Sequence, residues 1–140
     1  MKVFKAYLLA SRAHWGQVDK AGRPYINHPR YVASRFRDKN CKIVALLHDT
    51  VEDSFVSLSL IEKKFGTLIR DAVDAITKRP NEDYDTYLER VKSNDLAKRV
   101  KLADIYHNLD FMRLDKVDDK ARARIRKYLK GLSYLLELWI

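Results

Sequence analysis

Residues that interrupt helices are scarce in this sequence of 140 residues, which has four glycines and three prolines. Its one cysteine, Cys41, excludes an intramolecular disulfide and favours a reducing compartment. No apolar run approaches the roughly 20 residues that span a bilayer, and Lys5 and Arg12 interrupt the apolar patch near the N-terminus. The sequence therefore predicts a cytoplasmic protein with no membrane partner.

Sustained two-residue alternation of apolar and polar side chains, which is typical of half-buried strands, is also absent. Apolar residues recur instead at spacings of three and four, as in helices. Hydrophobic residues make up 46% of the chain and charged residues 34%, which is a globular rather than a disordered composition. We therefore predict an all-α fold, a compact helical bundle in which residues 1–140 form a single domain.

The predicted helices follow from this periodicity and from the residues that start and stop helices. They cover about 3–15, 29–37, 41–53, 57–65 or 59–65, 67–78, 83–92, 95–112 and 118–139. Their expected start signals are Pro29 at a first helical position, Asn40 and Thr67 as caps, and Ser59 with Glu62 as a capping box.

The net charge of +9 indicates a partner or substrate that carries negative charge. A basic domain can bind a nucleic-acid backbone, or it can concentrate phosphates around one pocket. The densest basic run, 118–131, comes with no recognised nucleic-acid motif, so we interpret it as a solvated helix face and expect no specific nucleic-acid binding. The apolar segment 132–140 is either a last core helix or the surface of a homo-oligomer.

The segment ALLHDTVEDS, residues 45–54, places four ionisable side chains after an apolar run. Residues four apart share a helix face, so we expect His48 beside Glu52 and Asp49 beside Asp53, in one polar sector. Three like charges repel one another unless a cation is present, and burying an unpaired charge is costly. A lone histidine here would more often be a core residue, but the full set predicts a metal site.

A second polar cluster lies in the segment KLADIYHNLD, residues 101–110. Asp104 and Asn108 are four apart, and His107 is close to both, in a helix whose apolar residues are expected to be buried. The presence of a second polar cluster in an apolar helix strengthens the prediction from the first, and indicates that both belong to one site.

The predicted metal site needs more ligands than the adjacent His48 and Asp49 supply. Imidazole and carboxylate ligands together suit a divalent transition metal such as Mn, Fe or Zn, whereas Mg prefers oxygens alone. The connection 16–28 is long for a compact domain, which makes it a functional candidate. His28, at the end of this connection, and Asp104 are the best placed residues to complete the site.

The ordered set H…HD…D resembles the pattern of the HD phosphohydrolase superfamily, in which these residues ligate the metal. Four motifs narrow the resemblance to the hydrolase domain of RelA/SpoT proteins and to the single-domain small alarmone hydrolases. They are AHWGQVDKAGRPYINHP (13–29), ALLHDTVED (45–53), FGTLIRDAVDAITK (65–78) and VKLADIYHNL (100–109). Four motifs in order, covering about residues 10–113, are far more specific than an HD dipeptide.

That family is an all-helical, Mn-dependent domain that removes the 3′-diphosphate of guanosine tetra- and pentaphosphate, (p)ppGpp, and releases pyrophosphate. The resemblance implies an HD-type bundle with an Mn²⁺ site formed by His28, His48, Asp49 and Asp104. It implies that Glu52 and Asp53 position and activate the attacking water. As residues that bind the nucleotide substrate, it offers Lys20, Lys78, Arg79, Asn108, Arg124 and Tyr128.

Two residues depart from the family pattern. Members usually carry an Arg that stacks on guanine at the position of Asp19, and the synthetase-linked members commonly carry Arg at the position of Ile105. A carboxylate cannot stack as a guanidinium does, so another nucleotide is an alternative substrate. A basic binding module that keeps the fold without turnover is a further alternative, which the complete set of charged site residues disfavours.

Overall fold

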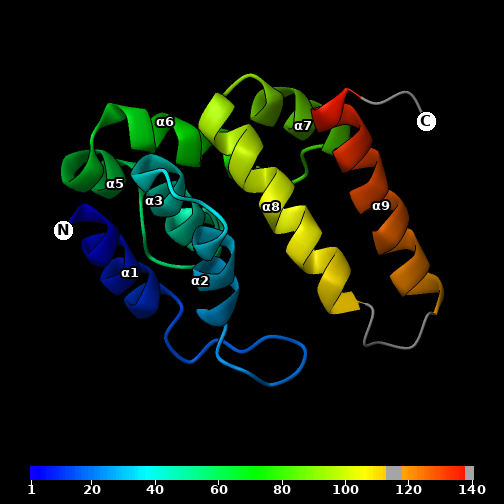
Figure 1. Cartoon of the computed structure of the whole chain (residues 1–140), viewed down its shortest axis with the longest axis horizontal. Helices are drawn as coiled ribbons and strands as arrows, with labels where there is room; N and C mark the ends of the chain where they lie inside the picture. The colour runs from blue at the N-terminus through cyan, green and yellow to red at the C-terminus, as the bar shows by residue number, and fades with distance from the viewer. Residues whose placement is uncertain (113–117, 138–140) are drawn as a thin grey trace.

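The computed structural model describes residues 1–112 and 118–137, and these residues form nine α-helices (Figure 1). In chain order they are α1 (Lys2–Ala13), α2 (Asn27–Ser34), α3 (Lys39–Leu47), α4 (Thr50–Asp53), α5 (Leu58–Phe65), α6 (Thr67–Ile76), α7 (Tyr84–Lys92), α8 (Asp95–Met112) and α9 (Asp119–Leu136). Within these ranges the backbone forms no strand, and one isolated antiparallel bridge joins Val18 to Pro24. The all-α prediction is confirmed. None of the described helices combines the length and the apolar composition that crossing a membrane requires.

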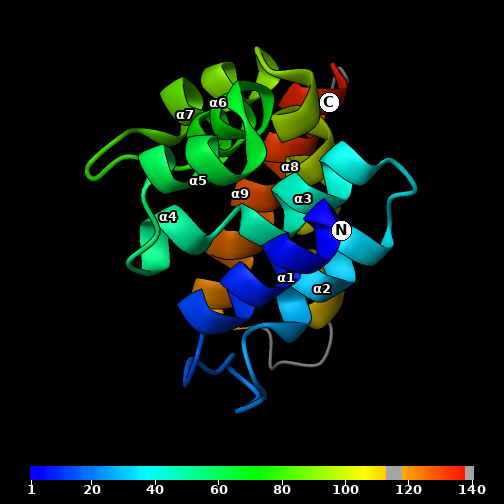
Figure 2. The same ribbon diagram turned by 90° about the vertical axis from the view of Figure 1, so that its left-hand side faces the viewer.

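Helices α3 and α8 form the centre of the bundle. α3 contacts α1, α2, α6 and α8, and α8 also contacts α2, α6, α7 and α9. Figure 1 shows α8 and α9 side by side along one edge of the molecule. The connection between α1 and α2 lies at the lower end of the molecule in both views (Figure 2), at the same end as the C-terminal part of α8.

The central position of α3 follows from its sequence. Cys41 and every residue from Ile43 to Leu47 are buried, so this helix has almost no polar face. A helix that is apolar nearly all round must lie inside the fold. Val100 and Ile105 of α8 belong to the same hydrophobic core.

The continuous helix predicted through His48 and Asp49 is wrong, because the structure interrupts it at these two residues. α3 ends at Leu47, and α4 begins at Thr50. His48 Nδ1 lies 2.6 Å from the Ala45 carbonyl oxygen, and the Thr50 hydroxyl donates to the Leu47 carbonyl at 2.7 Å. These side chains compete for carbonyls that an uninterrupted helix would use, which accounts for the break.

Two predicted helix caps are also wrong. Asp38 caps α3 in place of Asn40, because its carboxylate accepts from the amides of Asn40 and Cys41, each at 3.4 Å. Gly66 precedes α6 in place of Thr67, which is the first helical residue. The φ angle of Gly66 is 93°, a backbone conformation that favours glycine over a β-branched residue.

Two further helix starts refine the predictions. The capping box predicted at Ser59 and Glu62 is wrong, because Ser57 caps α5 and its hydroxyl accepts from the Leu60 amide at 3.1 Å. Of the two serines predicted to open this helix, Ser57 does so as its cap, and Leu58 is the first helical residue. α2 begins two residues before Pro29, which is tolerated because the first four amides of a helix have no intrahelical acceptor.

The C-terminal segment 132–140 is described as far as residue 137, so its last three residues, which the predicted helix 118–139 includes in part, lie outside the described residues. Leu132 packs against the core and Leu135 is buried, as a core helix requires. Tyr134 and Leu136 are exposed and are the described residues that a subunit interface could use.

Close packing between α9 and α7 depends on Gly131. A Cβ atom at this position would lie 2.6 Å from Tyr84 Oη and 3.1 Å from Ile105 Cδ1, well inside van der Waals contact. The missing side chain therefore allows α9 to approach α7 and α8 closely, and this places the N-terminal half of α9 against the site described below.

Candidate metal and substrate site

Side chains that are far apart in the sequence meet between α2, α3 and α8. His28, His48 and Asp104 each offer one ligand atom, and these atoms all lie within 4.8 Å of one another. Asp104 Oδ1 lies 2.8 Å from His28 Nε2 and 3.5 Å from His48 Nε2. Asp49 Oδ2 lies 3.2 Å from His48 Nε2 and 4.0 Å from His28 Nε2. The structure thus brings together the four residues predicted to bind a metal, here called the His/Asp cluster.

The backbone sets the orientation of His48, which is buried. Its Nδ1 lies 2.6 Å from the Ala45 carbonyl oxygen, so Nδ1 carries a hydrogen and donates it. Nε2 then faces the carboxylates of Asp49 and Asp104 and has no hydrogen-bond partner with acceptable geometry. A buried nitrogen held toward two carboxylates requires a proton or a cation between them, so the donor set fits a divalent transition metal.

The charges of the cluster compensate one another. Burial opposes the charged form of His48, but the carboxylates of Asp49 and Asp104 outweigh it and raise the pKa of His48 well above its ordinary value. Burial is the largest influence on Asp49 and Asp104 and opposes their ionisation, yet the pKa of each lies below its ordinary value. For Asp49, His48 and His28 together outweigh the burial, and for Asp104 Lys101, His28 and His48 together do so. Two ionised carboxylates therefore share positive charge that a bound metal can replace.

Neighbouring side chains hold the two aspartates of the cluster in place. The Tyr25 hydroxyl donates to Asp49 Oδ2, and burial, followed by the negative charge of Asp49, raises the pKa of Tyr25 so that it stays a donor. Lys101 Nζ lies 2.9 Å from Asp104 Oδ2. Asp104 is buried and Lys101 is largely enclosed beside it, so this ion pair lies inside the fold and not on its surface.

A column of rings holds His28. The Nδ1 atoms of His28 and His107 are 2.7 Å apart, and the two rings stack with centroids 4.9 Å apart. Tyr31 stacks on His107, with centroids 4.1 Å apart. The sequence predicted that His107 lies near Asp104, but it did not point to Tyr25 and Tyr31, although these two tyrosines lie three residues to either side of His28.

Glu52 and Asp53 lie in α4, directly after the break that positions Asp49. Glu52 lines a small cleft together with His48 and Asp49, and its Oε1 accepts from the Lys78 amide at 2.6 Å. Partial burial raises the pKa of both Glu52 and Asp53. A carboxylate whose pKa is raised is a stronger base once it is ionised, as the predicted role of these two residues requires.

A larger cleft of about 470 Å³ opens beside the His/Asp cluster. Four of the predicted substrate-binding residues line it, together with basic and aromatic side chains that sequence reasoning did not select. The predicted residues are Lys20, Asn108, Arg124 and Tyr128, and the others include Arg23, Tyr25, Tyr31 and His107. A cleft with aromatic faces and cationic groups suits a phosphorylated nucleoside.

The turn from Asp19 to Arg23 forms one rim of the larger cleft. Asp19 Oδ1 accepts from the amides of Ala21 and Arg23 at 2.9 Å and 3.0 Å, and the Asp19 amide donates to the Arg23 carbonyl at 2.8 Å. The carboxylate at the position where the family carries Arg thus stabilises the turn. Arg23, four residues later, supplies a guanidinium that lines the cleft.

A smaller cleft of about 150 Å³ lies on the other side of the cluster. Its basic side chains are Lys78, Lys101 and Lys127, and only Lys78 was predicted to bind substrate. Asn108 and Tyr128 line both clefts, so the two clefts are adjacent at these side chains. Asn108 Nδ2 also donates to Asp104 Oδ1 at 3.2 Å.

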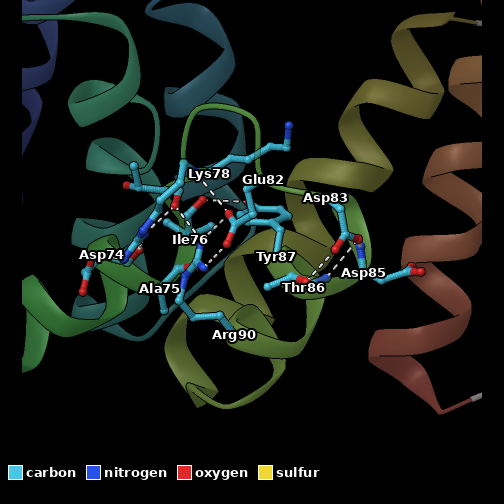
Figure 3. Close-up of polar contacts among 12 residues, drawn as sticks. Asp74, Ala75, Ile76, Lys78, Glu82, Asp83, Asp85, Thr86, Tyr87 and Arg90 are labelled. Carbon is cyan, nitrogen blue, oxygen red and sulfur yellow. Dashed lines mark hydrogen bonds and ion pairs between the residues drawn. The ribbon is translucent and has the colours of Figure 1, made fainter.

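Two of the predicted residues, Asp53 and Arg79, line neither of the clefts beside the cluster and line a third cleft instead. Arg79 belongs to a hydrogen-bond network at the end of α6. Its guanidinium donates to the Asp74 and Thr77 carbonyls and to the Asp74 carboxylate, each at 2.6 Å, within the connection between α6 and α7. Arg90 Nη2 also donates to the Thr77 carbonyl, at 2.9 Å. Figure 3 shows the Lys78 side chain extending away from this network. The network therefore fixes the backbone from which Lys78 projects.

Comparison with solved structures supplies the deciding observation. A metazoan orthologue of SpoT that hydrolyses ppGpp matches this chain with a TM-score of 0.81 and 26% sequence identity, over 96% of this chain and 85% of that one. The chain is a RelA/SpoT hydrolase-like HD domain. The predicted HD-type bundle is thereby confirmed.

Longer relatives contain a segment similar to this HD domain. A GTP pyrophosphokinase of Streptomyces coelicolor is 34% identical over 143 residues, which cover 91% of this chain and 17% of that protein. A GTP pyrophosphokinase of Myxococcus xanthus is 30% identical over 139 residues, covering 86% of this chain and 18% of that protein. The HD domain thus spans less than a fifth of the length of these relatives. No protein-family model matches the chain.

Proposed function

We propose that this HD domain is a metal-dependent nucleotide pyrophosphohydrolase that removes the 3′-diphosphate of (p)ppGpp, giving GDP or GTP and pyrophosphate. The observation that carries the proposal is the His/Asp cluster, with Glu52 beside it, between a nucleoside-sized cleft and a lysine-lined one. The similarity to a SpoT orthologue that hydrolyses ppGpp supports the choice of substrate. Mn²⁺ is the proposed metal, because it accepts both imidazole and carboxylate ligands.

The proposed reaction is a hydrolysis at phosphorus. The oxygen of a water molecule forms a bond to the phosphorus atom that is joined to the ribose 3′ oxygen, and the bond between this phosphorus and the 3′ oxygen breaks. The water loses one proton, and the 3′ oxygen gains one, so the products are a 3′ hydroxyl and pyrophosphate. When bound, the metal supplies Lewis-acid polarisation of the phosphate and lowers the pKa of water. His28, His48, Asp49 and Asp104 would hold it, and Glu52 or Asp53 would orient the water and accept its proton.

The larger cleft would bind the nucleoside and its 5′ phosphates. Lys20 would pair with phosphate oxygens, and Arg23 and Arg124 would either pair with phosphate oxygens or stack on the base, as guanidinium groups do well. Tyr128 and Asn108 stand where the two clefts join and would contact the ribose next to the scissile bond.

Two other activities have a specific observation in their favour. Asp19 holds its own turn and cannot stack on guanine, which favours a substrate with another base. The relatives similar over this segment are named for synthesis of a pyrophosphorylated guanosine nucleotide rather than for its hydrolysis. The first alternative keeps the metal chemistry and changes the substrate, whereas the second would need a donor nucleotide.

The test is pyrophosphate release from ppGpp by the purified chain, with and without Mn²⁺, beside a panel of other phosphorylated nucleotides and a mixture of ATP with GTP. The matched variants are Asp49→Ala, which removes a predicted ligand, and Asp95→Ala, which removes an exposed carboxylate paired with Arg99 at 3.2 Å. We expect Mn-dependent release that Asp49→Ala abolishes and Asp95→Ala preserves.

Each contrary result would support a different function for this chain. Release from a different nucleotide alone would replace the substrate, and formation of ppGpp from ATP and GTP would replace hydrolysis with synthesis. Activity of the Asp49→Ala variant equal to that of the unaltered chain would remove the proposed metal site. Inactivity across the whole panel would favour a noncatalytic binding module.

Three further expectations accompany the proposal. A hydrolase unit formed by residues 1–140, a cytoplasmic location and a homo-oligomer formed through α9 stay predictions. The exposed Leu129, Tyr134 and Leu136 are the described α9 side chains that such an interface would use. Sedimentation of the chain and of a Leu129→Glu variant would test the interface. If α9 joins two copies, the unaltered chain is expected to sediment as an oligomer and the variant as a monomer.

A further inference from the structure

The smaller cleft collects amino groups from three separate parts of the fold. Lys78 comes from the connection after α6, Lys101 from α8 and Lys127 from α9. They share a space of about 150 Å³, which is below the roughly 300–1,000 Å³ of ordinary small-molecule sites. A space of this size suits a small anion better than a nucleobase.

Aromatic rings and a carboxylate fix two of these ammonium groups. Lys101 Nζ lies 2.9 Å from Asp104 Oδ2 and 5.4 Å from the centroid of the Tyr87 ring. Lys127 Nζ lies 4.8 Å from the centroid of the Tyr84 ring. An ammonium group over an aromatic face is held by the ring quadrupole without losing its hydrogens as donors. These contacts therefore orient the amines in advance of any ligand.

The three like charges are close enough to oppose one another. Burial and then repulsion from Lys101 and Lys78 lower the pKa of Lys127. Such repulsion is relieved when an anion enters between the charges. Asp49 and Glu52 also line the cleft, where Asp49 accepts from Tyr25 and Glu52 accepts from the Lys78 amide. The negative charge of Glu52 offsets only part of the effect of burial and repulsion, because the pKa of Lys127 stays lowered.

The smaller cleft also lies next to the larger one and next to the His/Asp cluster, as the binding of one extended ligand requires. His48 and Asp49 of the cluster line the smaller cleft, and Asn108 and Tyr128 line both clefts. A ligand with its nucleoside in the larger cleft can therefore pass the cluster and extend a phosphate chain into the smaller cleft.

We propose that the smaller cleft binds the terminal phosphate of a diphosphate group, and that Lys127 is the residue that selects a diphosphate over a monophosphate ester at the scissile position. The inference rests on the proposed function, because it takes the bond to be broken to lie at the His/Asp cluster. The same three amines would hold inorganic pyrophosphate after hydrolysis and would make it a product inhibitor.

The test compares Lys127→Gln with Lys130→Gln, which removes the same charge from the same helix. Lys130 pairs with Asp85 at 2.7 Å and lines neither cleft. Inorganic pyrophosphate is titrated into the full chain by calorimetry at fixed ionic strength, with and without Mn²⁺, and its inhibition constant is measured during turnover of ppGpp. Guanosine 5′-diphosphate 3′-monophosphate serves as the substrate that lacks the terminal phosphate.

We expect Lys127→Gln to weaken pyrophosphate binding and raise its inhibition constant about tenfold, as loss of one charge-assisted contact implies. The same variant should lose most of its preference for ppGpp over the 3′-monophosphate, and Lys127→Arg should restore part of it. Lys130→Gln should behave like the unaltered chain. Pyrophosphate affinity and substrate preference that are equal in Lys127→Gln and Lys130→Gln would overturn the inference.

The outcomes separate this inference from the proposed function. Pyrophosphate binding that depends on Lys127, in a chain that hydrolyses no nucleotide, would support the anion site and remove the proposed hydrolysis. Turnover of ppGpp with no effect of Lys127→Gln on either pyrophosphate measurement would support the hydrolysis and reject the anion site.

Discussion

The His/Asp cluster and the larger cleft lie side by side but are built by different means. In the cluster, His48 and Asp104 are buried on or beside core helices, and each faces a partner that fixes its orientation. In the larger cleft, Lys20, Arg23 and Tyr31 are exposed on a turn and a short helix. The cluster is therefore preorganised, whereas the rim of the cleft can change with little effect on the core.

This difference explains the two departures from the family pattern. Asp19 lies in the exposed turn, where its carboxylate serves the backbone and Arg23 brings a guanidinium to the cleft. Ile105 is completely buried in α8, lines neither cleft and belongs to the hydrophobic core. Changes at these positions alter the rim or the packing and leave the cluster intact.

The largest expected effect comes from breaking the cluster itself. Asp104→Asn keeps the shape of the side chain but removes the negative charge that His28, His48 and Lys101 share. We expect Mn²⁺ affinity to fall by about a hundredfold or more and kcat by about a thousandfold. Metal titration and ppGpp turnover measure these effects, with Asp95→Asn on the same helix as the control. Normal metal affinity in the variant would show that Asp104 only pairs with Lys101.

A smaller effect is expected when the cluster keeps its metal but loses a base. Glu52→Gln should lower kcat about a hundredfold and leave Mn²⁺ affinity unchanged. Burial raises the pKa of Glu52 above the ordinary pKa of a glutamate. As the pH falls, Glu52 therefore loses its ionised form at a higher pH than an exposed glutamate would. The acid limb of the pH profile of kcat should therefore lie at higher pH than the ordinary titration of a glutamate, and it should be absent from the variant. A variant with an unchanged pH profile would dismiss Glu52 as the base.

The larger cleft should respond in KM and not in the chemistry. Arg124→Ala removes a guanidinium from the wall of this cleft, so KM for ppGpp should rise about tenfold with little change in kcat. Inhibition by inorganic pyrophosphate should be unchanged, in contrast to its response to Lys127→Gln. A fall in kcat with KM constant would mean that Arg124 acts on the reacting phosphate, and would erase the distinction between cleft and cluster.

The smallest expected effect comes from the turn that forms the rim. Asp19→Ala removes the acceptor for two amides of an exposed turn, which should lower the free energy of unfolding by about 0.5 kcal/mol. KM should rise a few fold, because Arg23 is less well held, and Mn²⁺ affinity should not change. Thermal unfolding and steady-state kinetics measure both, and loss of metal binding would show that rim and cluster are coupled.

The sequence was a good guide to most of the cluster, because His48, Asp49 and Asp104 are polar residues in segments with strong apolar patterns. His28 stood out only by its place at the end of the long connection and by the family resemblance. His48 and Asp49 were predicted to lie on a continuous helix, however, and the break between α3 and α4 depends on side chains that bond to Ala45 and Leu47 carbonyls. Such competition between side chain and backbone leaves no trace in periodicity.

The clefts were harder to predict, because they are assembled from contacts between distant helices. Lys127 was part of a basic run interpreted as a solvated face, and only the packing of α9 on α7 through Gly131 turns it toward Tyr84. Lys101 was not selected as the wall of a cleft. Arg79 was selected as a substrate-binding residue from the family resemblance, whereas its guanidinium bonds to Asp74 and Thr77.

The long separation between the ligands has a consequence for folding. His28 and Asp104 are 76 residues apart in the sequence and belong to two helices, α2 and α8, that pack against each other. A cation shared by them is therefore a crosslink that only the native chain can form, so metal occupancy and folding are thermodynamically linked. At a hundred times its dissociation constant the metal would add about 2.7 kcal/mol to the free energy of unfolding. A chelator would thus lower the melting temperature as well as the turnover, and the metal supply of the cell would set how much of the chain is folded.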